Sequence, residues 1–298
     1  MNKRTALQKI LHFFLTKIII GVATIVALVA LVELLRKLSL DKMNLTDNLK
    51  NIIVAVVESG IVVSGYILLF RVYEKRQISE LSASAFVKNA IIGCVIGLLL
   101  QSLFILVIYI GGTYSVVHVN SVSTLITPFA FALTAGFVAE ILMIGIAFRL
   151  LEEQSGTVIA LTVFIILFVV LHLNAKGATF VSVGATAMQA GFMLPAAYVF
   201  SRNLWLTIFL HFSWDFAEPG IFGGINPSTG ITEGLFTNKI TGNSLLTGGQ
   251  TGPQDSLQSL IFCLLTGIIF LQLAKQKNNF IKPNWQRTAT NNSITASV

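Results

Sequence analysis

Long apolar stretches, separated by short polar segments, dominate the chain. Runs with few charged residues lie near 18–35, 51–70, 89–111, 123–148, 157–173, 179–200, 203–217 and 256–274. About 20 apolar residues in a helix cross the hydrocarbon core of a bilayer. Backbone polar groups in lipid must be satisfied within the spanning element, which favours helices. The pattern predicts an all-α fold, a polytopic membrane helix bundle with about eight transmembrane helices.

The composition agrees with this reading. Hydrophobic residues make up 54% of the 298 positions and charged residues 11%, whereas soluble domains carry about 25% charged residues. The partner expected from composition is therefore the lipid bilayer, and not nucleic acid. The two cysteines, Cys94 and Cys263, both lie inside apolar runs, which argues against a disulfide framework or a cysteine-based zinc site.

Basic residues are distributed unequally between the two ends of the predicted helices. If the first run is an uncleaved span with its N-terminus inside, one side collects Lys3, Arg4, Lys9, Arg71, Lys75, Arg76, Lys88, Arg149, Arg202, Lys275, Lys277, Lys282 and Arg287. The other side holds Arg36, Lys37, Lys42, Lys50, Lys176 and Lys239. Cytoplasmic loops are enriched in Lys and Arg. The prediction is a multi-pass protein of the cell membrane with both termini in the cytoplasm.

Two segments are polar. Residues 216–255 are rich in Gly, Thr and Asn and are predicted to form an irregular loop. The C-terminal "TATNNSITASV" is predicted to be disordered.

Few ionisable residues lie inside the predicted spans, and such residues are functional candidates by default. They are Glu58, Glu140, His172, His211 and Asp215. We expect Glu58 to pair with a neighbouring helix. Near the span ends, Glu152 and Glu153 are expected to be solvated. Trp205 and Trp214 suit anchoring at the membrane interface, although Trp214 could also form a wall of the cavity beside His211.

Spacing groups four of these positions. Phe168 and His172 are four residues apart, as are His211 and Asp215, and such pairs share one helical face. A carboxylate and two imidazoles could meet in the bundle core and suit water activation and oxyanion stabilisation. Lone polar residues in membrane helices also serve as interhelical hydrogen-bonding groups. Spacing alone leaves both readings open.

At these positions the sequence resembles the CPBP, or ABI, group of intramembrane proteases, which are related to type II CAAX prenyl endopeptidases. Members carry Glu-Glu-x-x-x-Arg, then Phe-x-x-x-His, then His-x-x-x-Asn or Asp. The phrases that carry the resemblance are "YEKRQISELS", "FRLLEEQSG", "LWLTIFLHFSWDF" and "LLTGGQTGPQDS". The resemblance implies a protease-like membrane core over 73–275, preceded by N-terminal transmembrane helices over 1–72 and followed by a polar tail over 276–298.

The resemblance also implies a peptide or membrane-protein substrate or partner, and it implies roles for particular residues. In the family, the first Glu and the second-motif His activate a water, and the third motif stabilises the oxyanion. The catalytic candidates here are Glu140, His172, His211 and Asp215. The first motif departs from the pattern, because it reads Ala139-Glu140-x-x-x-Ile144. Shifting the frame by one residue brings Gly145 to the Arg position, so the Arg is missing in either frame.

Three functions follow. The first is a peptide-bond hydrolase within the membrane, with Glu140 as the base. The second is a non-catalytic scaffold, immunity or regulatory protein, a pseudoenzyme that keeps the fold. The third is a small-molecule or proton transporter, which the absence of visible inverted repeats disfavours. The family resemblance points to metal-independent glutamate chemistry, so no metal and no other cofactor is expected.

Overall fold

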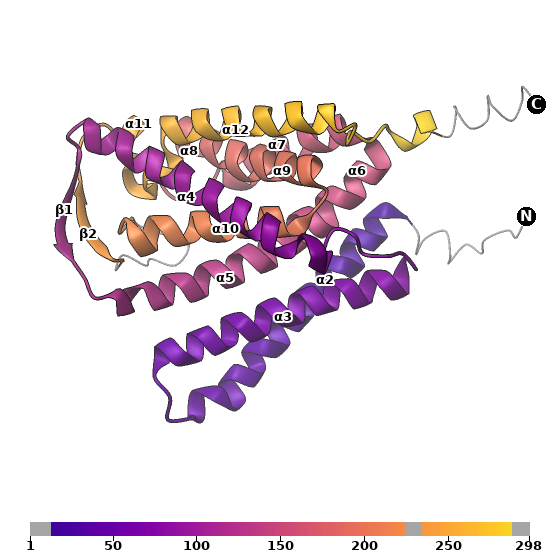
Figure 1. The fold of residues 1–298 in the computed structure, drawn as a ribbon, viewed down its shortest axis with the longest axis horizontal. Helices are drawn as coiled ribbons and strands as arrows, with labels where there is room; N and C mark the ends of the chain where they lie inside the picture. Colours follow the sequence, from indigo (N-terminus) through magenta and orange to yellow (C-terminus); the bar gives the residue numbers. More distant parts are fainter. Residues whose placement is uncertain (1–12, 225–233, 288–298) are drawn as a thin grey trace, which may run out of the picture.

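The protein is a bundle of apolar helices in the computed structural model, which describes residues 13–224 and 234–287 (Figure 1). Within that part, six helical segments are long and apolar enough to cross a membrane: Phe14–Lys42, Asp47–Tyr73, Ala83–Ile110, Val122–Ser155, Phe180–Ser201 and Leu257–Gln276. Thr157–His172 is a shorter apolar helix. An all-α membrane helix bundle is therefore confirmed, and the count of eight spans is not.

The helices follow one another with short connections. Their bounds are α2 Phe14–Leu38, α3 Asp47–Tyr73, α4 Phe86–Ile110, α5 Ile126–Glu140, α6 Arg149–Ser155, α7 Thr157–His172, α8 Phe180–Thr186, α9 Leu194–Ser201, α10 Leu204–Phe216, α11 Ser244–Thr247 and α12 Leu257–Gln276. Three π-helical segments extend the α-helices that precede them: Ile141–Phe148, Ala187–Met193 and Ala217–Ile221. Short polar side chains cap several starts; for example, Asn203 accepts a hydrogen bond from the Trp205 N–H at 3.0 Å.

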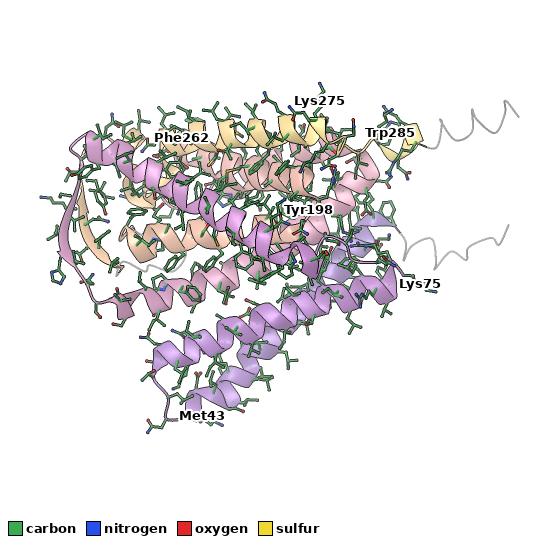
Figure 2. The ribbon with its side chains drawn as sticks, in the orientation of Figure 1. Met43, Lys75, Tyr198, Phe262, Lys275 and Trp285 are labelled. Atoms are coloured by element: carbon green, nitrogen blue, oxygen red, sulfur yellow. The ribbon has the colours of Figure 1, made fainter. Side chains whose placement is uncertain are left out.

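The two ends of the bundle are distinct. The described chain enters and leaves at the same end, to the right in Figure 1. Lys75, Lys275 and Trp285 lie toward this end, while Met43 marks the far turn of the α2–α3 hairpin (Figure 2). This alternation of the helices matches the sidedness used to sort the basic residues.

Helix α10 lies within the bundle, and glycines let its neighbours approach it. A Cβ placed on Gly97 of α4 would lie 2.6 Å from the Leu210 carbonyl oxygen, and one on Gly136 of α5 would lie 2.9 Å from that of Ile208. Real Cβ atoms do not come so close to a carbonyl oxygen. Small residues at helix interfaces permit such close backbone packing in membranes, and these two glycines fix the distance of α4 and α5 from α10.

The region predicted as one irregular loop contains regular structure. Strand β2 Phe236–Ile240 pairs antiparallel with β1 Tyr114–Val119, with Tyr114 opposite Ile240 and a register shift between Val116 and His118. Residues 217–221 continue α10, and α11 follows β2. Residues 225–233 of this region, together with 1–12 and the tail 288–298, lie outside the described residues.

An ionic network joins the elements at the end where the termini lie. Glu74 contacts Lys17 at 2.8 Å, Arg76 at 2.9 Å and Arg149 at 3.1 Å. Arg76 also pairs with Glu80, which accepts a hydrogen bond from the Tyr66 hydroxyl at 2.6 Å. Here buried carboxylates and cations occur together.

The pKa values in this network reflect that pairing. Burial alone would raise the pKa of Glu80, but hydrogen bonds from Arg76 and Tyr66 hold it below its usual value. The pKa of Glu74 is likewise lowered: the cost of burial is outweighed by Arg149, Lys17 and Arg76. Both groups are therefore held as carboxylates.

Glu152 was expected to be solvated, and that expectation is wrong. Its side chain is fully buried and takes two hydrogen bonds from Arg202, at 2.6 and 3.0 Å, and one from Thr157 at 2.6 Å. Glu153, one residue later, is exposed. A buried carboxylate needs such partners, and Arg202 comes from a turn about fifty positions away that helical spacing does not reveal.

Candidate functional site

Glu140 and His211 meet in the bundle core. Glu140 is the last residue of α5 and is 2% exposed, while His211 lies on α10. Glu140 Oε1 lies 2.9 Å from His211 Nδ1. The sequence left open whether Glu140 faces His172 or His211, and the structure gives His211.

Asp215 lies on the other side of the same imidazole. Its Oδ2 is 3.4 Å from His211 Nε2, one helical turn along α10. Each ring nitrogen therefore faces a carboxylate oxygen. A doubly protonated imidazole donates from both nitrogens, so this arrangement favours the imidazolium form and leaves two carboxylates sharing one cation.

The second oxygen of Glu140 lacks a protein partner. Oε2 is buried and makes no hydrogen bond to any residue in the described ranges. A buried oxygen of this kind is costly unless another molecule or a proton satisfies it. A water hydrogen-bonded there would have its proton within reach of a base.

The backbone explains why Glu140 arrives at this place. Gly136, one turn before it, packs against the backbone of Ile208 and Phe212, which flank His211 on α10. Phe137 completes the contact, with its ring edge-on to Phe209 at a centroid distance of 5.9 Å. The close approach of α5 and α10 thus brings the carboxylate within hydrogen-bonding distance of the imidazole.

The cation that the family pattern places after Glu140 is missing from the structure as well as from the sequence. Ile144 is 1% exposed and belongs to the apolar core. Arg149, the next cation along this helix, contacts Glu74, Glu153 and the Gly145 carbonyl oxygen. His211 is therefore the cationic group that Glu140 contacts.

His172 stands apart from this group. Its Nδ1 lies 2.9 Å from the Phe168 carbonyl oxygen, and its ring stacks on that of Phe168. The expected pairing of the two residues on one face of α7 is thus present. Among the described residues, however, His172 makes no hydrogen bond to Glu140, His211 or Asp215, so the meeting of two imidazoles with the carboxylate is not found.

Sequence reasoning missed Glu218. It is 2% exposed and accepts hydrogen bonds at Oε2 from Gln101 Nε2 (3.2 Å) and from the Gln254 N–H (3.0 Å). It follows His211 and Asp215 at helical spacing in "HFSWDFAE". That spacing was the available signal, but residues from 216 onward were assigned to a loop.

Both tryptophans of α10 are buried. Trp214 is 1% exposed and donates to Gln254 Oε1 at 3.4 Å, and Trp205 packs against Phe86 and Phe137. Both side chains form part of the packing around α10, which for Trp214 agrees with the alternative of an interior position.

The residues of the site do not converge as a metal centre would. Over 13–224 and 234–287, no group of three or more His, Cys, Asp or Glu side chains is arranged to hold a metal ion. Both nitrogens of His211 face carboxylates, and His172 lies elsewhere.

Comparison with known proteins identifies the same part of the chain. Residues 121–217 match the family described as type II CAAX prenyl endopeptidase Rce1-like. The match spans α5, α7 and α10 and so includes Glu140, His172, His211 and Asp215. No curated protein and no solved structure matches the chain.

Proposed function

We propose that this chain, which belongs to the Rce1-like family of type II CAAX prenyl endopeptidases by its match over residues 121–217, hydrolyses a peptide bond of a substrate segment at or within the membrane. The observation that carries the proposal is the buried Glu140, with one oxygen 2.9 Å from His211 and the other without a protein partner. Other buried polar atoms, such as Arg149 Nη2 and Glu218 Oε1, also lack a partner in the described residues, so the oxygen supports the proposal together with the family match.

In the proposed reaction Glu140 is the general base. Its Oε2 removes a proton from a water, and the water oxygen attacks the scissile carbonyl carbon. The tetrahedral intermediate collapses when Glu140 returns that proton to the leaving amine nitrogen, which breaks the C–N bond. His211 holds Glu140 in place and balances its charge, and Asp215 orients His211. His172 is proposed to assist in activating the water, which is the role that the family resemblance gives to the second-motif His.

The location follows from charge. We propose that the protein lies in the cell membrane with both termini in the cytoplasm, because the end that carries the termini also carries most Lys and Arg residues. The division into 1–72, 73–275 and 276–298 is proposed on the same resemblance, and the matched segment falls within its central part.

The test is cleavage by the purified full chain in detergent. Peptides and prenylated peptides would be incubated with the protein, and products identified by mass spectrometry. Glu140→Gln keeps the shape and removes the base, so we expect a loss of about 10³-fold or more. His211→Ala should also abolish cleavage. The matched control is Glu33→Gln on α2, an acid already paired with Arg36, which should leave the rate unchanged.

A non-catalytic member is the second candidate. It is favoured by the place of His172, whose Nδ1 is engaged by the Phe168 carbonyl oxygen and which does not contact Glu140. Peptides that bind the wild-type protein without being cut, and bind Glu140→Gln equally well, would support this second candidate and contradict the first.

A further inference from the structure

A polar cavity lies between the N-terminal hairpin and α5, outside the group around His211. Its volume is about 250 Å³. Helices α2, α3 and α5 all contribute polar residues to its wall: Glu33, Arg36, Asn51, Glu58, Thr127 and Thr134. In Figure 1 the hairpin of α2 and α3 packs along the side of the bundle where α5 lies.

Glu58 is the unusual member of this wall. It is 3% exposed and lies in the middle of α3. It makes no hydrogen bond and no ion pair with any residue of the described part of the chain. The expected pairing with a neighbouring helix is limited to a longer-range electrostatic interaction with Arg36 of α2. A buried carboxylate without a partner in a membrane helix requires a proton or a cation.

The neighbouring cation is engaged elsewhere. Arg36 contacts Glu33 at 3.7 Å, Asp41 at 3.5 Å and Asn51 Oδ1 at 3.3 Å. Helix α5 contributes only hydroxyls and apolar groups to the wall. The formal charges of Glu33, Arg36 and Glu58 add to −1, so the cavity has a place for one positive charge.

We propose that this cavity binds a small primary amine in its ammonium form, with Glu58 as the counter-ion. An ammonium group has three N–H donors and no acceptor, which suits a carboxylate with nearby hydroxyl oxygens such as that of Thr134. Ala130 and Phe131 offer an apolar surface to the carbon atoms of the ligand. The volume is below that of sites for drug-sized molecules, which begin at about 300 Å³.

The ammonium group that binds in the cavity can come from two sources: a free amine, or the aminoethyl headgroup of a phospholipid. Both present a primary ammonium on a two-carbon stem. The proposal does not depend on the proposed peptidase activity, because none of the lining residues contacts His211.

Ethanolamine is the probe for the first experiment. It would be titrated into the purified full chain in detergent, and the thermal unfolding temperature followed by tryptophan fluorescence. A ligand that binds the folded state raises that temperature with concentration. Glu58→Gln should weaken ethanolamine binding about tenfold or more, since a charged hydrogen bond is lost. The matched control is Glu153→Gln, an exposed acid outside the cavity wall, which should keep the affinity.

Two results would overturn the proposal: no shift for the wild-type protein, or equal shifts for the wild-type protein and Glu58→Gln. If Glu58→Gln fails to fold, a comparison of two ligands on the wild-type protein still tests the proposal. Choline has the same charge but no N–H donors, and should bind about tenfold more weakly than ethanolamine. Equal affinities would contradict an ammonium site.

Nanodiscs distinguish the two sources. If phosphatidylethanolamine occupies the cavity, nanodiscs containing it should abolish the shift with ethanolamine, while phosphatidylcholine nanodiscs should retain the shift. If the ligand is a free amine, the shift should persist in both. Either result supports the site, and loss of the shift in both kinds of nanodisc would overturn it.

Discussion

Two groups of buried acids in this protein are built differently. At the end where the termini lie, Glu74, Glu80 and Glu152 each contact at least one arginine. In the core of the bundle, Glu140 and Asp215 share one histidine, and Glu140 keeps an oxygen without a protein partner.

The difference in partners indicates that the first group serves the stability of the fold and the second the proposed reaction. Arginine is always charged and offers five N–H donors in a fixed geometry, so it fixes a carboxylate in one state. A histidine can gain or lose a proton. Acids paired with arginine should therefore matter for folding, and acids paired only with histidine should matter for the proposed reaction.

The largest effect on stability is expected from removing an arginine that pairs with a buried acid. Arg202→Ala leaves Glu152 buried without its bidentate partner. We expect a loss of about 3–5 kcal/mol in the free energy of unfolding, measured by denaturation in detergent, while any cleavage rate per folded molecule stays the same. A matched change at Lys275, on the same side but exposed, should have little effect on stability.

The second prediction concerns Asp215. Asp215→Ala removes the group that faces His211 Nε2 at 3.4 Å. The imidazole loses one charged hydrogen bond, and we expect cleavage to fall about 10- to 100-fold. Unfolding should be little changed, because the side chain is partly exposed. A larger loss of stability than of activity would place Asp215 with the structural acids.

The third prediction tests the packing that brings the site together. Gly136→Ala puts a Cβ within 2.9 Å of the Ile208 carbonyl oxygen, so α5 must move from α10. Overpacking of this kind costs about 1–3 kcal/mol, and the contact of Glu140 with His211 should lengthen, with a lower cleavage rate. Gly60→Ala is the control, since no atom lies within 4 Å of its added Cβ.

The smallest expected effect is a loss of stability at acidic pH. The pKa values of Glu74 and Glu80 are lowered in the folded protein. Their contribution is therefore present above the usual carboxyl pKa and is lost as the pH falls through the lowered values. Unfolding temperatures measured across that range should fall less steeply for Glu80→Gln than for the wild-type protein. Parallel curves would show that Glu80 contributes nothing to acid sensitivity.

The sequence predicted the helical class, because apolar length reports local geometry, and the four-residue spacing of His211 and Asp215 placed them on one helical face. The contact of Glu140 with His211 joins two helices, and spacing alone left it open. Sequence reasoning misassigned elements that depend on distant contacts. Glu152 is buried by Arg202 from another turn, and β2 forms only by pairing with β1, more than a hundred positions earlier. Whether His172 contacts Glu140 or His211 directly depends on how α7 packs in the bundle, which no local spacing encodes.

The π-helical segment Ile141–Phe148 bears on how proteins of this kind are compared. An α-helix repeats its hydrogen bonds every four residues, whereas a π-helix repeats them every five. A motif written as fixed spacings assumes the first interval, so across Ile141–Phe148 a spacing of four does not place two side chains on one face. Letters counted past Glu140 in the motif therefore do not report which side chains lie beside the carboxylate.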